Sequence, residues 1–199
     1  VVTEMYAYVA FLIIILTYGM ETAFFRFSSQ SEEKSKVYST TLISIVCTSF
    51  IFMLFAAVFS QPVADWLRYP NHSEYVTWFA IIVGLDALSS IPLARLREQN
   101  RATTIATVNL VNIAVNIGLN LFFLVYCKNI FDGGQSNWMV DTFYNPEIGV
   151  GYVFISNLIA SITKCALLLP WMLTIKLDLD RVLLRKMILY ASPLLIAGL

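Results

Sequence analysis

Long apolar stretches separated by short polar connections dominate the chain. Five of them have the length of a membrane-spanning helix, because a bilayer core about 30 Å thick needs about 20 apolar residues. They occupy residues 5–27, 37–59, 75–94, 102–127 and 148–175, and a sixth begins near Met187. The alternating strand pattern of a membrane barrel is missing from the sequence. The pattern therefore predicts an all-α, polytopic membrane bundle in which each helix closes its own backbone hydrogen bonds.

The composition points the same way. Of the 199 residues, 58% are apolar and 13% are charged, whereas soluble domains carry about 25% charged residues. Thirteen basic residues balance thirteen acidic ones, so no net field would attract nucleic acid. Water-soluble enzymes, nucleic-acid binders and disordered chains are all disfavoured, and we expect no nucleic-acid partner.

The two ends of the chain suggest a piece of a longer protein. The sequence begins at Val1 without an initiator methionine and ends at Leu199 inside an apolar run. No signal-peptide pattern precedes the first apolar stretch. We expect residues 1–199 to form one membrane domain within a longer polytopic chain.

Basic residues are distributed unevenly over the connections. Ten lie in or beside the first, third and fifth connections, whereas Arg68 and Lys128 alone mark the second and fourth. The positive-inside rule places the three basic connections in the cytoplasm. They lie near residues 28–36, 95–101 and 176–186. The longest connection, residues 128–147, is then expected outside as an interfacial loop.

Polar side chains within apolar spans are costly, so they usually face a bundle interior or a wet cavity. Four asparagines of the fourth stretch fall within an arc of about 80° on one helix. They are Asn109, Asn112, Asn116 and Asn120. Two interpretations stay open. The amides either hold neighbouring helices together, or they line a cavity and contact a polar substrate.

The fifth stretch carries a lysine within its apolar run. Asn157, Ser161 and Lys164 fall within an arc of about 60°. Lys164 lies about 12 residues, or about 18 Å, from the cytoplasmic end, which is too deep for easy snorkelling. It needs a carboxylate, a water-filled cavity or an anionic ligand. Asp86 is the matching acid, and it either pairs with Lys164 or titrates and binds a coupling cation.

Two further charges lie near the cytoplasmic end of the first stretch. Arg26 either snorkels to the interface or points into an inward-facing vestibule, and Glu21 is a second candidate for ion coupling. The single histidine, His72, is expected in an outer loop. The sequence has no glycine-rich phosphate loop, paired metal ligands or nucleophile beside a histidine. We therefore expect a transporter without a cofactor rather than an enzyme.

Several short motifs are similar to those of a known membrane-protein family. They are YGMETAFFRF at residues 18–27, SQP and ADWL within 60–67, IPLA and REQNRA within 91–102, and YNPEIGVGY at 144–152. Together they resemble bacterial polysaccharide-biosynthesis proteins of the Wzx-like flippase type. That type belongs to the multidrug/oligosaccharidyl-lipid/polysaccharide (MOP) exporter superfamily, which also contains the MATE-like exporters.

The resemblance implies about 12 to 14 helices in two lobes around a central cavity. This chain would then supply helices two to six and the start of helix seven, most of the first lobe. It also implies that an oligosaccharide linked to undecaprenyl diphosphate is flipped across the bacterial inner membrane by alternating access. The expected partners are this lipid-linked oligosaccharide, membrane lipids and a coupling proton or sodium ion.

The chemistry of that substrate assigns roles to the polar residues. A diphosphate in a low-dielectric cavity needs buried cations, and sugars need amide and hydroxyl partners. The candidates for the diphosphate are Lys164 and Arg26. The candidates for the sugar or its path are Asn109, Asn112, Asn116 and Asn157. The candidates for the coupling ion are Asp86 and Glu21.

Two other functions stay open. A MATE-like multidrug exporter would use an acidic, aromatic-lined pocket, which Asp86 and Glu21 permit, but Lys164 in the cavity would disfavour a cationic drug. An intramembrane glycan polymerase or transferase would need an acid/base cluster near an interface. The long outer connection offers Lys128 as its one basic residue, so an enzyme is less well supported.

Overall fold

The computed structural model describes residues 2–66, 73–133, 138–146, 148–174, 176 and 178–198. All regular secondary structure in these residues is helical. Five helices are long and apolar enough to cross a membrane, so the predicted all-α, multi-pass fold is confirmed. Arg68 and His72, which the sequence places in an outer connection, lie outside the described residues.

The first apolar stretch is broken into two helices. α1 spans Val2–Thr17 and α2 spans Met20–Gln30, and between them Tyr18 and Gly19 have φ angles of 33° and 72°. Left-handed residues cannot continue a right-handed helix, and glycine adopts a positive φ without a Cβ clash. The predicted first span is confirmed as one apolar segment, Tyr8–Gln30, but its helix is interrupted at these two residues.

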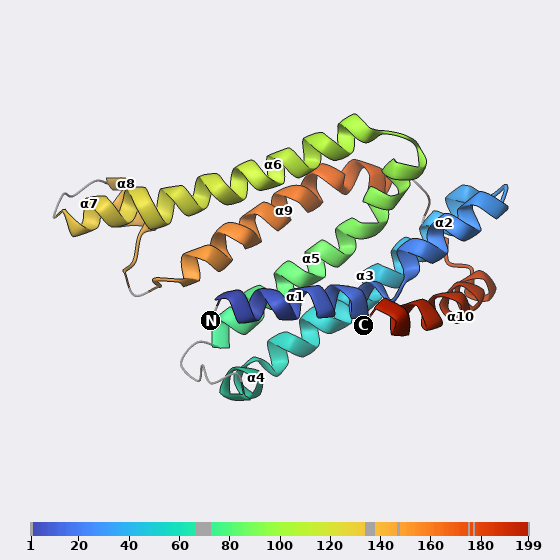
Figure 1. Ribbon diagram of the computed structural model, residues 1–199, viewed down its shortest axis with the longest axis horizontal. Helices are drawn as coiled ribbons and strands as arrows, with labels where there is room; N and C mark the ends of the chain where they lie inside the picture. The colour runs from blue at the N-terminus through green and yellow to red at the C-terminus, as the bar shows by residue number, and fades with distance from the viewer. Residues whose placement is uncertain are drawn as a thin grey trace.

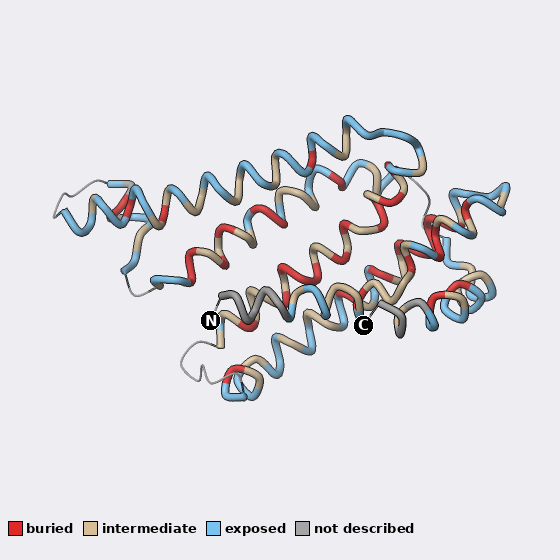
Figure 2. Tube along the Cα trace, in the orientation of Figure 1, coloured by how far each residue is buried: buried red, intermediate tan, exposed pale blue. Residues whose placement is uncertain are grey.

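α5 is the central helix of the bundle. The chain passes through α3 (Lys34–Val58) and the short α4 (Ser60–Trp66) before α5 (Ser73–Glu98) returns to the other end. α5 packs against α3 on one side and α9 (Gly151–Leu173) on the other (Figure 1). It is also the most buried of the five spans, and Figure 2 shows its buried residues along most of its length.

The fourth span is longer than the sequence predicts. α6 (Ala102–Leu121) continues through a π-helical segment, η1 (Phe122–Cys127), into α7 (Lys128–Asp132). Gly133 follows α7, and the short α8 (Trp138–Phe143) lies further along the same connection. Much of the expected outer loop is therefore helical. The helix continues into α7 because residues 119–132 contain neither glycine nor proline.

Stacked aromatic rings join η1 to the start of α9. The centroid of the Tyr152 ring lies 4.5 Å from that of Phe123 and 5.4 Å from that of Tyr144. The Tyr152 hydroxyl donates to the Phe143 carbonyl at 3.1 Å and accepts from the Asn145 amide at 2.6 Å. These contacts fix the return of the chain into α9.

The three basic connections meet at one end of the bundle, the right-hand end of Figure 1. Lys34 Nζ lies 2.8 Å from Glu98 Oε1, and this ion pair joins the first connection to the third. The Asp178 amide donates to Ser39 Oγ at 2.6 Å, which joins the fifth connection to α3. α10 (Arg181–Gly198) follows and packs against α2 and α3. The grouping agrees with the charge pattern, and the cytoplasmic location of this end stays a prediction.

Candidate functional site

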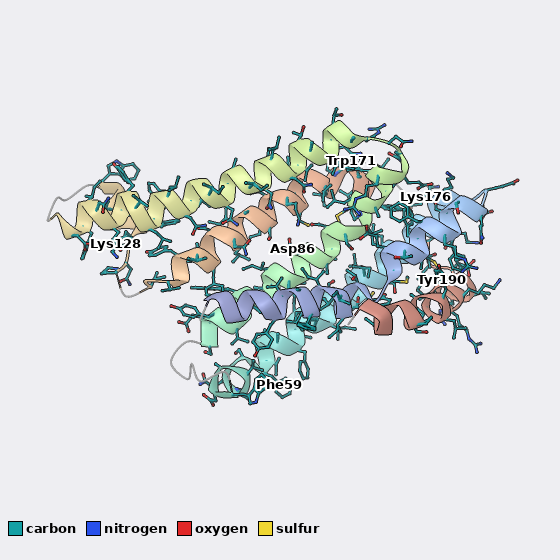
Figure 3. The ribbon with its side chains drawn as sticks, viewed as in Figure 1. Phe59, Asp86, Lys128, Trp171, Lys176 and Tyr190 are labelled. Carbon is teal, nitrogen blue, oxygen red and sulfur yellow. The ribbon has the colours of Figure 1, made fainter. Side chains whose placement is uncertain are left out.

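Lys164 and Asp86 meet between α9 and α5. Lys164 Nζ donates to Asp86 Oδ1 at 2.6 Å, and Ser161 Oγ donates to the same oxygen at 3.3 Å. The lysine and aspartate side chains are 13% and 23% exposed. Figure 3 labels Asp86 on α5, close to the facing helix α9. Of the partners that a deep lysine needs, the structure supplies the carboxylate.

The local sequence explains why these groups converge. On α9, residues spaced by three and four lie on one face, so Ser161 and Lys164 both reach α5. On α5, Ser89 and Ser90 lie close to Asp86 in sequence but donate to backbone carbonyls of their own helix, at 2.8 Å and 2.6 Å. They therefore leave Asp86 to the side chains of α9.

The pair has two chemical capabilities. A lysine ammonium carries three N–H donors, so it can contact an anionic ligand in addition to, or in place of, the carboxylate. If Asp86 takes up a proton or another cation, the attraction that holds Lys164 weakens. Both changes would alter a contact between two spans that is largely shielded from water.

The asparagines fall into two groups. Asn116 Nδ2 on α6 donates to Asn157 Oδ1 on α9 at 3.4 Å, and Asn120 Nδ2 donates to Asn116 Oδ1 at 2.7 Å. The Asn116–Asn157 contact joins two helices, as in the first interpretation, whereas the Asn120–Asn116 contact lies within α6. Asn112 Oδ1 is buried without a hydrogen-bond partner in the described part of the chain, and Asn109 is exposed.

Glu21 and Arg26 lie apart from the Asp86–Lys164 pair. Glu21, in the first turn of α2, forms an ion pair with Arg97. Arg97 follows Asp86 by eleven residues, or about 16 Å along α5, so the two candidate coupling acids form separate contacts. Arg26 is exposed, and its Cζ lies 4.1 Å from the ring centroid of Tyr190 on α10.

Sequence reasoning missed the interactions of Arg95. Its Cζ lies 4.4 Å from the ring centroid of Tyr38 on α3, and Nη1 donates to the Trp171 carbonyl on α9 at 3.3 Å. Figure 3 labels Trp171 near the end of α9. Both partners are distant in sequence. The one local feature that pointed to Arg95 was its position as a cation at the end of an apolar span.

A family model described as polysaccharide biosynthesis protein matches residues 1–131, about two thirds of the chain. The match includes Glu21, Arg26, Asp86 and the asparagines of α6, whereas Asn157 and Lys164 lie beyond it. Comparisons with curated proteins and with solved structures give no match. The resemblance indicated by the short motifs is confirmed, and the chain belongs to the polysaccharide biosynthesis protein family.

Proposed function

We propose that this chain forms part of a transporter that flips an oligosaccharide linked to undecaprenyl diphosphate across the bacterial inner membrane. The observation that carries the proposal is the family match in a chain with five apolar spans. The ion pair between α5 and α9 adds a chemical reason, because a diphosphate headgroup needs a cation inside the membrane. The proposed activity is transport by alternating access, not catalysis.

In this proposal, Lys164 binds the diphosphate by exchanging its partner. Without substrate, Asp86 neutralises the ammonium at 2.6 Å. A diphosphate carries more negative charge than one carboxylate, so it competes for the lysine at the same place. Asp86 is then released to take up the coupling proton or sodium ion. Substrate binding and ion binding are thereby linked through one contact.

The sugar would be bound by amides of α6 and α9. Asn109 is exposed, so it can accept a hydrogen bond from a sugar hydroxyl directly. Asn112 Oδ1 is buried without a described partner, so it would accept one only after neighbouring helices move apart. Asn116 and Asn157 bind each other, so they would first have to exchange partners. Arg26 and Glu21, at the basic end, would act where substrate approaches from the cytoplasm.

The test of transport uses the complete gene in cells that lack their own glycan flippase and make a matched lipid-linked glycan. We expect restored delivery of that glycan to the periplasmic face. No delivery, despite verified expression in the membrane and a matched donor, would contradict the proposal.

Variants in the same assay test the roles of the pair. Lys164→Gln is expected to reduce delivery by at least tenfold, and Lys164→Arg to retain part of it. Lys128→Gln is the matched control, because it makes the same change at an exposed lysine at the start of α7, away from the pair. Normal delivery by Lys164→Gln would refute the diphosphate contact, and unchanged ion dependence in Asp86→Asn would refute the coupling role.

A further inference from the structure

A polar pocket lies at the end of the bundle that carries the basic connections. Its volume is about 280 Å³. The lining comes from the start of α3 and the end of α5, and consists of Lys34, Ser35, Tyr38, Arg95, Glu98 and Gln99. Arg95 follows Asp86 by nine residues, or about 14 Å along α5, so the pocket is distinct from the Lys164–Asp86 contact.

Arg95 has no carboxylate at ion-pair distance among the described residues. By contrast, Lys34 and Arg97 each have one and Lys36 has two. Arg95 is half-buried and instead stacks on Tyr38 and caps the Trp171 carbonyl in the last turn of α9. That carbonyl is one of the groups a helix end leaves without an internal partner.

These contacts orient the guanidinium without using all of it. An arginine side chain has five N–H donors in a planar fork, and the hydrogen bond to Trp171 uses one of them. Stacking on the Tyr38 ring holds the plane of the fork. A fixed guanidinium with spare donors, beside a pocket, is suited to bidentate binding of a phosphate oxygen pair.

Lys34 supplies a second positive charge with a replaceable partner. Lys34 Nζ lies 2.8 Å from Glu98 Oε1, and its side chain is 61% exposed. The same oxygen of Glu98 also accepts from Ser28 Oγ at 2.7 Å. If Lys34 turns toward an anion in the pocket, Glu98 therefore keeps a hydrogen bond. The exchange therefore removes the ion pair of Glu98 but leaves its carboxylate hydrogen-bonded to Ser28.

We propose that this pocket binds a phosphate-bearing anion, with Arg95 as the bidentate contact and Lys34 as the second cation. The pocket lies where the candidate spans of α3 and α5 begin and end, which is where we expect lipid headgroups. The phosphate of a lipid headgroup and a free phosphate compound share the required chemistry. The lipid source rests on the proposed function, whereas the anion site does not.

The test measures binding by the complete protein in nanodiscs, with inorganic pyrophosphate as the free probe and undecaprenyl phosphate in the nanodisc as the lipid probe. Arg95→Gln is expected to weaken pyrophosphate binding about tenfold or more, because it removes a charged hydrogen-bonding contact. Lys34→Gln is expected to weaken it severalfold. Arg185→Gln is the matched control, since Arg185 is an exposed arginine of α10 outside the pocket lining.

Each outcome decides between specific possibilities. Unchanged binding in a folded Arg95→Gln protein, or equal weakening in Arg185→Gln, would overturn the site. If Arg95→Gln does not fold, Lys34→Gln decides, because that exposed side chain can be replaced without loss of packing. Competition between undecaprenyl phosphate and pyrophosphate would show that the anion comes from a lipid. Pyrophosphate binding without such competition would show that it comes from a free phosphate compound. Absent transport with retained pyrophosphate binding would refute the proposed function alone.

Discussion

Lys164 Nζ lies 2.6 Å from Asp86 Oδ1, so the lysine of α9 is neutralised by an acid of the central helix α5. Both side chains are mostly covered, and the pair therefore connects two adjacent spans where water is scarce. Breaking such a pair leaves one charge without compensation, whereas removing both charges does not. Stability and transport should consequently respond differently to single and double substitutions.

Lys164→Met alone is expected to destabilise the protein by about 3 kcal/mol, because Asp86 stays covered and unpaired. The double variant Asp86→Leu with Lys164→Met should recover most of that loss, since it replaces the pair by apolar side chains. Thermal unfolding of the complete protein in detergent measures both. A double variant that is as unstable as Lys164→Met alone would contradict this account.

The spans and this ion pair follow from the sequence for related reasons. Hydropathy over about 20 residues decides which segments enter a bilayer, and a charge deep in such a segment requires a partner that few residues can provide. Pairing with Lys164 was therefore one of the two roles that the sequence predicts for Asp86. Hydropathy carries no information on backbone angles, so it does not predict the interruption of the helix at Tyr18 and Gly19.

The remaining contacts of the site depend on how the helices pack. Glu21 pairs with Arg97 and Arg26 stacks on Tyr190, and in each case the partner belongs to a helix far along the chain. Many charged and aromatic residues at the same end had the right chemistry for these contacts. Only the packing of α2 between α5 and α10 selects among them.

The positive φ of Gly19 predicts that its replacement is costly. Gly19→Ala should lower stability by about 1 kcal/mol or more, because an L residue at φ 72° brings Cβ close to the following carbonyl. Gly118→Ala in α6 is the matched control, since a Cβ there meets no atom within 4 Å. Alanine favours a helix over glycine, so this control should be neutral or stabilising. Equal losses in the two variants, compared by thermal unfolding, would argue against the strain at Gly19.

Gly84 permits the close approach of α3 to α5. A Cβ at Gly84 would lie 2.7 Å from both Cγ and Sδ of Met53, a separation that forces one of the helices or the methionine to move. Gly84→Ala is expected to destabilise the protein by about 1 to 3 kcal/mol. Adding Met53→Ala should restore part of the loss, because it removes the clashing atoms. Without any such rescue in thermal unfolding, the contact would not explain the cost.

Asp180 predicts a pH-dependent contribution at the start of α10. Its Oδ1 accepts from the Leu183 and Val182 amides at 3.0 Å and 2.9 Å, and its Oδ2 lies 3.2 Å from Lys36 Nζ. The backbone hydrogen bond from Leu183, followed by the one from Lys36, lowers the pKa of Asp180 below its ordinary value of 3.8. A carboxylate with a lowered folded-state pKa stabilises the fold above its unfolded value, and this contribution is lost as pH falls through the folded value.

Asp180→Asn isolates that contribution, because asparagine caps a helix about as well as aspartate but carries no charge. The variant should be less stable than the wild type at pH 7, and the difference should shrink as the pH falls below 3.8. Unfolding midpoints of both proteins at a series of pH values measure this difference directly. A gap of the same size at pH 3 and pH 7 would show that the carboxylate charge does not stabilise the join between α3 and α10.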